Sequence, residues 1–137
     1  MGLNERFIIL FGALALLMRV GFAWYATGLS RSKNAAGAVL RNVLDFCVAT
    51  LAFWAVGAAI FGGDPGLYFD HAGHTNHTTF FHLVLVLFAT AIPIGAGGER
   101  SKLFPLGVVS FLMAAVVVPL AAYLAWTGFL ARMGYLD

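Results

Sequence analysis

The histidines of this chain are the residues whose type and spacing point most directly to chemistry. His71, His74 and His77 follow one another at intervals of three residues, and His82 comes five residues later. Neutral imidazole rings bind zinc, copper or nickel, and close spacing in one loop lets several rings reach the same ion. A polar loop between apolar segments also needs such side chains to be solvated. Two interpretations therefore stay open for His71, His74 and His77, a metal site and a solvated loop, whereas we expect His82 to hydrogen-bond in a buried position.

Arg19 and Asp45 are charged residues that stand inside long apolar segments. An arginine near the middle of a membrane helix costs at least about 2.5–3.5 kcal/mol on insertion scales, so it should face protein or water and have a partner. Asp45 is the one acidic residue inside an apolar segment and is the natural candidate. Three interpretations stay open: a structural ion pair that holds helices together, a contact with another subunit, and a proton or ion relay.

The composition indicates that the elements carrying these residues are membrane helices. Of the 137 residues, 61% are hydrophobic and 10% are charged, whereas a soluble domain usually has about 25% charged residues. About 20 apolar residues cross a bilayer core of about 30 Å, and the backbone in lipid must satisfy its own hydrogen bonds. We therefore expect an all-α integral membrane protein with a single membrane domain over residues 1–137. Its four transmembrane helices are expected at residues 7–29, 38–61, 78–97 and 103–126.

The basic residues indicate which way the helices cross the membrane. Lysine and arginine collect in two of the three connections between apolar segments, while the connection over residues 62–77 has neither. Cytoplasmic loops carry the excess of lysine and arginine, so we expect both termini on the external, periplasmic side of a bacterial inner membrane. The residues expected on the cytoplasmic side are Arg31, Lys33, Arg41, Arg100 and Lys102. Contact with anionic lipid or a cytoplasmic partner is their alternative role, and we expect Glu99 and Arg100 to hold the third helix against the first turn.

The rest of the chain argues against several classes of function. A net charge of +2 is too small to argue for nucleic acid as a partner. Cys47 is the single cysteine, which rules out an intrachain disulfide and a cysteine metal cluster. The motifs G-x-S-x-G and H-E-x-x-H and a phosphate-binding loop are absent from the sequence, which predicts a protein that is not an enzyme. No cofactor is predicted, and contacts with lipid or pigment stay open.

A pattern of small, polar and charged residues crosses the first two apolar segments and the basic turn between them. The residues that form it are Met18, Gly21, Phe22, Gly28, Arg31, Lys33, Asn34, Arg41, Asn42, Asp45, Phe46, Trp54 and Gly57. This pattern resembles the ammonium transporter (Amt/Mep/Rh) family. Further matches are Phe80-Phe81-His82, Gly98-Glu99-Arg100 and, more weakly, Trp126-Thr127-Gly128. We assign Arg31, Lys33 and Asn34 of the turn a structural or interface role.

The resemblance implies both a fold and a candidate binding site. It covers the family's first four transmembrane helices, so it implies a truncated half of an ammonium-transporter-like fold. Phe81 and Trp126 match aromatic positions that cradle the cation in the family, and a ring face attracts a cation within about 6 Å. Aromatic side chains near a membrane surface also form the ordinary anchoring belt. The chain departs from the family at Leu85, which replaces a gating phenylalanine, and at Arg19 and Ala26, which replace a glutamine and a glutamate.

Two hypotheses of function follow from these matches and departures. The family's paired pore histidines lie on helices beyond these four, so no residue is assigned to them and the conduction path is expected to be incomplete. The favoured hypothesis is a small accessory or scaffold subunit that packs in a larger complex, with membrane lipids and other membrane subunits as partners rather than copies of itself. The alternative is an ammonium transporter or binding module that rebuilds a pore by oligomerisation.

Overall fold

The computed structural model of this protein describes residues 3–62, 77–97, 101–126 and 128–134, and the regular structure in these ranges is helical. In chain order the elements are α1 (Leu3–Leu29), η1 (Ser32–Asn34), α2 (Ala35–Ala52), the π-helical turn η2 (Phe53–Gly57), α3 (Ala58–Gly62), α4 (His77–Gly97), α5 (Leu103–Leu112), the π-helical turn η5 (Met113–Val117), α6 (Val118–Trp126) and α7 (Phe129–Arg132). Within these ranges, four helical spans are long and apolar enough to cross a bilayer. The predicted fold class, an all-α membrane protein with four transmembrane helices, is confirmed.

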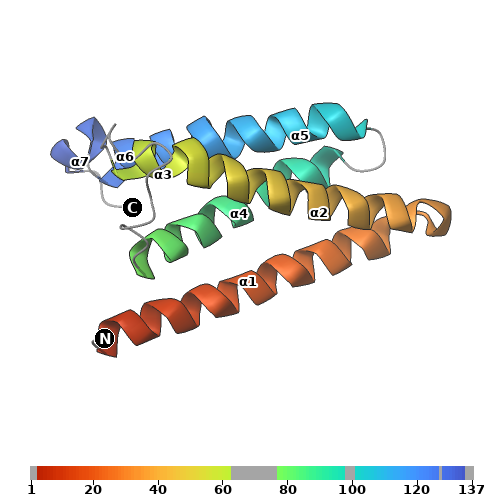
Figure 1. Cartoon of the computed structure of the whole chain (residues 1–137), viewed down its shortest axis with the longest axis horizontal. Helices are drawn as coiled ribbons and strands as arrows, with labels where there is room; N and C mark the ends of the chain where they lie inside the picture. Colours follow the sequence, from red (N-terminus) through yellow and green to blue (C-terminus); the bar gives the residue numbers. More distant parts are fainter. Residues whose placement is uncertain (1–2, 63–76, 98–100, 127, 135–137) are drawn as a thin grey trace.

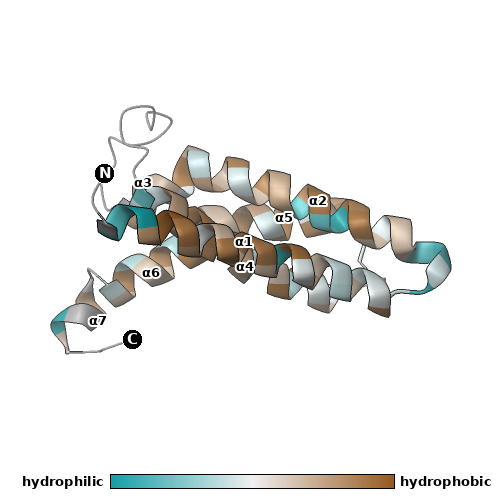
Figure 2. Cartoon of the chain, turned by 90° about the horizontal axis from the view of Figure 1, so that it is seen from below, coloured by the Kyte–Doolittle hydropathy of each residue, from teal (hydrophilic) through white to brown (hydrophobic). Residues whose placement is uncertain are grey.

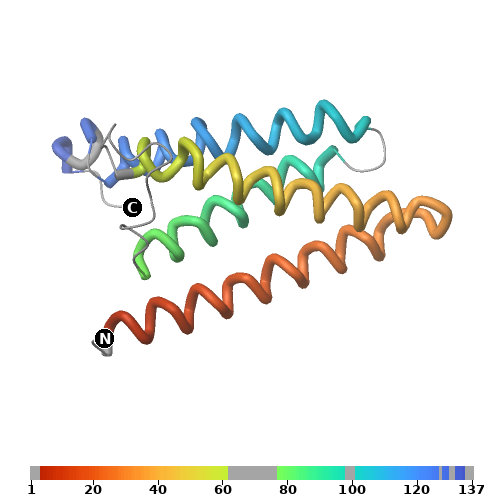
Figure 3. Tube along the Cα trace, in the orientation of Figure 1, coloured from red at the N-terminus to blue at the C-terminus, as the bar shows by residue number. Residues whose placement is uncertain are grey.

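The spans form a bundle in which each runs opposite to the one before it (Figure 1). α4 packs against α1, α2 and α5, and α2 packs against α1, α4 and α5, so these two helices are central. The tube view shows α1 along one side of the bundle (Figure 3). The start of α1 and the end of α6 share one end of the bundle, here called the N-terminal end. The turn at η1 and the start of α5 lie at the other, here called the turn end.

Polar and apolar residues separate along the length of the bundle. Hydrophobic residues cover the middle of the helices, and hydrophilic residues gather at both ends and at one place within α2 (Figure 2). The turn end carries Arg31 directly before η1, Lys33 within η1 and Lys102 directly before α5. This distribution fits a bundle that crosses the bilayer along its long axis. Which end faces the cytoplasm stays a prediction.

The core between α2, α4 and η5 combines small and branched apolar side chains. Val86 and Leu87 of α4 are fully buried there. Small residues let helices approach closely in lipid, where helix association depends on van der Waals packing and hydrogen bonds. The buried members of this core are Ala49, Ala52, Phe53, Val86, Leu87, Ala114 and Ala115. The alanines explain how three helices come close enough to share one core.

The π-helical turns η2 and η5 lie against each other in this core. The sequence predicted uninterrupted helices here, and the wide turns are a departure from that expectation. Gly57 in η2 is the point of closest approach, because a Cβ atom there would lie 2.7 Å from the carbonyl oxygen of Ala114 and 3.2 Å from Cγ of Pro119. The contact between the two turns therefore requires a residue without a side chain at position 57. Such wide turns are rare and often lie at functional sites.

The first span is much less covered by protein than the others. Of its most apolar stretch 11% is buried, against 28–33% for the other three spans. Large apolar side chains such as Leu17, Trp24 and Tyr25 are exposed along α1. An apolar helix of this kind is stable only against lipid or further protein. α1 is therefore the helix of this bundle that faces its surroundings most.

Candidate functional site

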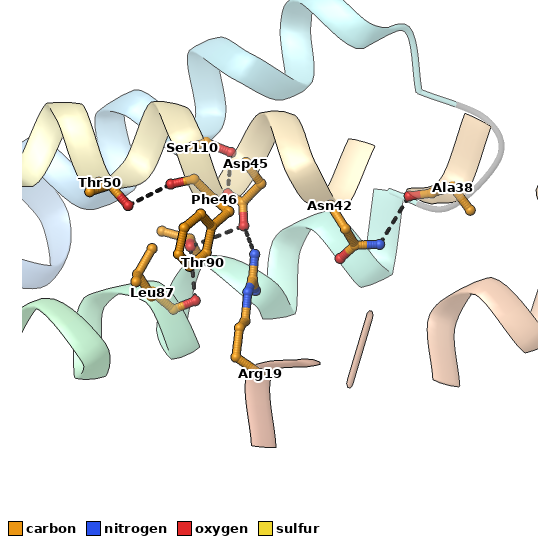
Figure 4. Close-up of polar contacts among 9 residues, drawn as sticks. All are labelled: Arg19, Ala38, Asn42, Asp45, Phe46, Thr50, Leu87, Thr90 and Ser110. Atoms are coloured by element: carbon orange, nitrogen blue, oxygen red, sulfur yellow. Dashed lines mark hydrogen bonds and ion pairs between the residues drawn. The ribbon is translucent and has the colours of Figure 1, made fainter. Parts of the chain in front are cut away.

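The carboxylate of Asp45 joins all four spans inside the bundle. Asp45 of α2 is 0% exposed, and Nη2 of Arg19 on α1 forms an ion pair with its Oδ2. Ser110 of α5 donates a hydrogen bond of 2.5 Å to Oδ1, and the hydroxyl of Thr90 on α4 donates to Oδ2 at 3.2 Å (Figure 4). Each span therefore contributes one polar side chain to a single group, here called the Asp45 cluster.

The helices place this cluster near the middle of the membrane. Arg19 lies ten residues before Leu29, the last residue of α1. At about 1.5 Å per residue this is roughly 15 Å, or half of a bilayer core of about 30 Å. Charged groups at that depth are stable only when they are paired and hydrogen-bonded. The ion pair between Arg19 and Asp45, the two residues that the sequence placed together, meets that requirement.

The guanidinium of Arg19 is only partly satisfied. Its side chain is buried, and Nη1 has no hydrogen-bond partner among the described residues. Asn42, one turn before Asp45, donates from Nδ2 to the carbonyl oxygen of Ala38 at 3.0 Å, while its Oδ1 has no partner in the same part of the chain (Figure 4). The carboxylate oxygens, by contrast, accept from three side chains. The structure thus contains the ion pair within the chain, while the relay and the contact with another subunit stay predictions.

Replacing Ser110 by alanine tests the contribution of one hydroxyl to the cluster. We expect the free energy of unfolding to fall by about 0.6–1.7 kcal/mol, the range measured for side-chain hydrogen bonds between membrane helices. Thr50→Val is the matched control, because the Thr50 hydroxyl donates to the carbonyl oxygen of Phe46 on its own helix. Thermal unfolding in detergent measures both variants. An equal loss of stability in both variants would show that the hydrogen bond of Ser110 between helices adds nothing to the free energy of unfolding.

Three aromatic rings meet at the N-terminal end of the bundle and are here called the aromatic cluster. The ring centroids of Phe61 on α3 and His82 on α4 are 3.9 Å apart, with an interplanar angle of 24°. Trp126, the last residue of α6, lies 5.5 Å from Phe61 and 5.7 Å from His82. His82 was expected to hydrogen-bond, and the interaction found is ring stacking. Three spans thus end in one group of rings.

The remaining predicted residues are distributed over both ends of the bundle. Phe81 is half-buried on α4 beside His82, and its predicted role with Trp126 in cation binding stays a prediction. At the turn end, Arg31 and Lys33 are exposed and Asn34 is half-buried. Their structural or interface role also stays a prediction. The predicted pair Glu99 and Arg100 lies outside the described residues.

The predicted metal ligands lie at and before the start of α4. His77 is the first residue of that helix and is half-buried, whereas His71 and His74 lie outside the described residues. In the part of the chain that the structure describes, no group of three His, Cys, Asp or Glu side chains is placed to hold a metal ion. The metal interpretation of His71, His74 and His77 therefore stays an untested prediction.

Sequence reasoning missed Thr90, Ser110 and Phe61. Thr90 and Ser110 stand 45 and 65 residues from Asp45 in the sequence. A hydroxyl inside an apolar span is a weak signal, because such a group also bonds to a carbonyl of its own helix, as Thr27 does to Ala23 at 2.8 Å. Only the packing of the helices shows which hydroxyls reach the carboxylate.

Two cavities flank the contact between α1 and α2. One, of about 410 Å³, is bordered by α1, α2 and α4 and has Phe22, Arg41 and Ile94 in its wall. The other, of about 530 Å³, lies between α1 and α2 and has Arg19 and Trp24 in its wall. Both cavities therefore lie at the side of the bundle, next to α1.

The sequence matches the Ammonium Transporter Family over residues 6–137. It is 34% identical to ammonium transporter Amt2 of Archaeoglobus fulgidus over 128 residues, which are 85% of this chain and 27% of that protein. It is 30% identical to the putative ammonium transporter sll0537 of Synechocystis sp. (92% of this chain, 25% of the relative). With putative ammonium transporter 1 of Caenorhabditis elegans the identity is 28% (94% and 26%). No solved structure matches the chain.

These relatives are all described as ammonium transporters, two of them as putative ones, and the chain matches a similar share of each. The chain spans about a quarter of the length of the curated relatives named here. The match includes all four described membrane spans and therefore both the Asp45 cluster and the aromatic cluster. The four apolar spans and these matches together show that the chain is an integral membrane protein that belongs to the ammonium transporter family.

Proposed function

We propose that this chain is a module of an ammonium transporter, and that ammonium passes along the side of the bundle where the bundle meets further transmembrane protein. The observation that carries this proposal is the family match over residues 6–137. The relatives that cover the chain are described as ammonium transporters. The further protein is either more polypeptide of the same kind or another membrane subunit.

The packing inside the bundle supports a path at its side. Leu87, Thr90, Asp45 and Ser110 are fully buried and occupy the space between the spans. A cation crossing there would have to separate Asp45 from its partners and pass the buried positive charge of Arg19. The exposed apolar surface of α1 and the cavities beside it present a lateral surface instead. A path formed against this surface would leave the Asp45 cluster intact.

The aromatic residues support a cation-binding site at the N-terminal end of the bundle. Trp126 is held beside Phe61 and His82, while Phe81 joins the proposed site through the resemblance to the family alone. The face of an aromatic ring attracts a cation within about 6 Å, and the attraction is largest for tryptophan. We therefore assign Phe81 and Trp126 to ammonium binding in this proposal.

An accessory or scaffold subunit is the second candidate function. The observation in its favour is the wide apolar surface of α1, which another membrane subunit would cover. The two candidates differ at the aromatic residues, because only the transport module needs Trp126 to contact ammonium. Purification in mild detergent followed by mass spectrometry identifies the proteins that surround the chain. Uptake measured on that native assembly then separates the two candidates.

Replacing Trp126 by alanine is expected to lower the initial rate of methylammonium uptake into liposomes roughly two- to thirtyfold. The range follows from about 0.5–2 kcal/mol for a cation–π contact, converted at about 1.4 kcal/mol per factor of ten. Phe104→Ala is the matched control, because Phe104 is 82% exposed at the start of α5, at the turn end of the bundle and away from both the aromatic cluster and α1. Uptake that is equally fast in both variants would favour the accessory subunit.

A further inference from the structure

His82 stands where its charge would act directly on the proposed cation site. Its ring lies parallel to Phe61, with centroids 3.9 Å apart, and 5.7 Å from the ring of Trp126. The side chain is half-buried. These distances place the imidazole within the range over which an aromatic face attracts a cation. A proton on His82 would therefore put a positive charge beside Trp126, one of the two rings that the proposed function assigns to ammonium.

Histidine is the side chain whose ordinary titration falls between pH 5 and 8. Other ionisable groups at this end of the bundle must be considered, and α3, which supplies Phe61, has none within Ala58–Gly62. The described ones on the neighbouring elements are Glu5 and Arg6 of α1, His77 of α4, Tyr123 of α6 and Arg132 of α7. Asp64, Asp70, His71 and His74 precede α4 in the sequence and lie outside the described residues. Of the described groups, His77 is the other imidazole and provides the control.

We propose that His82 makes cation binding at Trp126 dependent on pH, because the protonated imidazole and an ammonium ion beside Trp126 would repel each other. This inference rests on the proposed function of the same site. When His82 is neutral, no positive charge from its ring opposes a cation beside Trp126. When it is protonated, its positive charge repels a second cation close by. Binding and uptake of ammonium therefore fall as the pH at this end of the bundle is lowered.

Uptake measured at two pH values tests the consequence for transport. Methylammonium stays protonated at both pH 7.5 and pH 5.5, so the substrate itself changes little. In the native protein, the initial rate at pH 7.5 is expected to exceed that at pH 5.5 roughly tenfold, as expected for two like charges at short range. In His82→Gln this ratio is expected to approach one, whatever the absolute rate. In His77→Gln the ratio is expected to stay that of the native protein.

Fluorescence of Trp126 tests the same competition without requiring transport. A protein carrying Trp24→Phe and Trp54→Phe has Trp126 as its remaining tryptophan, and a protonated imidazole quenches a neighbouring indole. Emission is expected to fall between pH 7.5 and pH 5.5, and His82→Gln is expected to abolish the fall. Ammonium chloride is expected to move the midpoint to lower pH, because binding of the ion and of the proton are linked reciprocally. Sodium chloride at equal ionic strength is expected to leave the midpoint in place.

The two measurements separate a failure of this inference from a failure of the proposed function. An emission change that survives His82→Gln, or a midpoint that ammonium does not move, overturns the inference. An uptake ratio that is the same in His82→Gln and the native protein also overturns it and leaves the transport module intact. Absence of uptake at both pH values, in a protein whose midpoint does respond to ammonium, overturns the transport function and supports the competition at His82.

Discussion

Asp45→Ala is expected to lower the free energy of unfolding by about 3–5 kcal/mol, the range for removing one partner of a buried ion pair. The loss is large because Arg19 would keep its charge inside the bundle, where Nη1 already lacks a hydrogen-bond partner among the described residues. The hydroxyl of Ser110 would lose its acceptor at the same time, whereas Thr90 can still donate to the carbonyl oxygen of Leu87 at 3.1 Å. Thermal unfolding in detergent, followed by size-exclusion chromatography, measures the change.

A double variant shows how much of this loss comes from the unpaired charge. Arg19→Met combined with Asp45→Leu removes both charges and keeps apolar volume, and such exchanges are often neutral or stabilising. We expect the double variant to be more stable than Asp45→Ala alone. Arg132→Ala, which changes an exposed charge on α7, is expected to have little effect. A double variant as unstable as the single one would show that packing, not charge, is what Asp45 supplies.

Gly57→Ala is expected to destabilise the bundle by about 1–3 kcal/mol, the usual cost of overpacking a core. The new methyl group would lie 2.7 Å from the carbonyl oxygen of Ala114, which belongs to backbone and cannot rotate away. It would also lie 2.9 Å from Cδ2 of Phe53. The two π-helical turns would have to separate. The gain of up to about 1 kcal/mol from replacing glycine by alanine in a helix works in the opposite direction and is the smaller effect.

Gly21→Ala is the control that isolates this gain in helix propensity. Gly21 also lies inside a membrane helix, α1, and a Cβ atom there meets no other atom within 4 Å. We expect Gly21→Ala to be neutral or slightly stabilising, and the difference between the variants measures the contact at Gly57. The apparent unfolding temperature of each protein in the same detergent gives that difference. Equal unfolding temperatures of the two variants would mean that η2 can move to accommodate the methyl group without loss of stability.

The membrane spans could be predicted from the sequence because hydrophobicity over about 20 residues is a local property. The four predicted segments correspond to the four spans of the structure. The ion pair could be predicted for a related reason. A charge inside an apolar span needs a partner, and Asp45 is the one acid available inside another span. The resemblance to the ammonium transporter family rested on residues around the basic turn, and the family match over residues 6–137 confirms it.

The contacts between spans depend on rotation and depth, which no short stretch of sequence specifies. Thr90 and Ser110 join Asp45 because α4 and α5 turn those faces toward α2. Phe61 and His82 stack because α3 ends and α4 begins at the same level, beside the last residue of α6. The sequence thus determined the four spans of the described residues that are long and apolar enough to cross a membrane, and which charges must pair. The tertiary structure alone decided which hydroxyls and rings meet, because those contacts form between helices far apart in the chain.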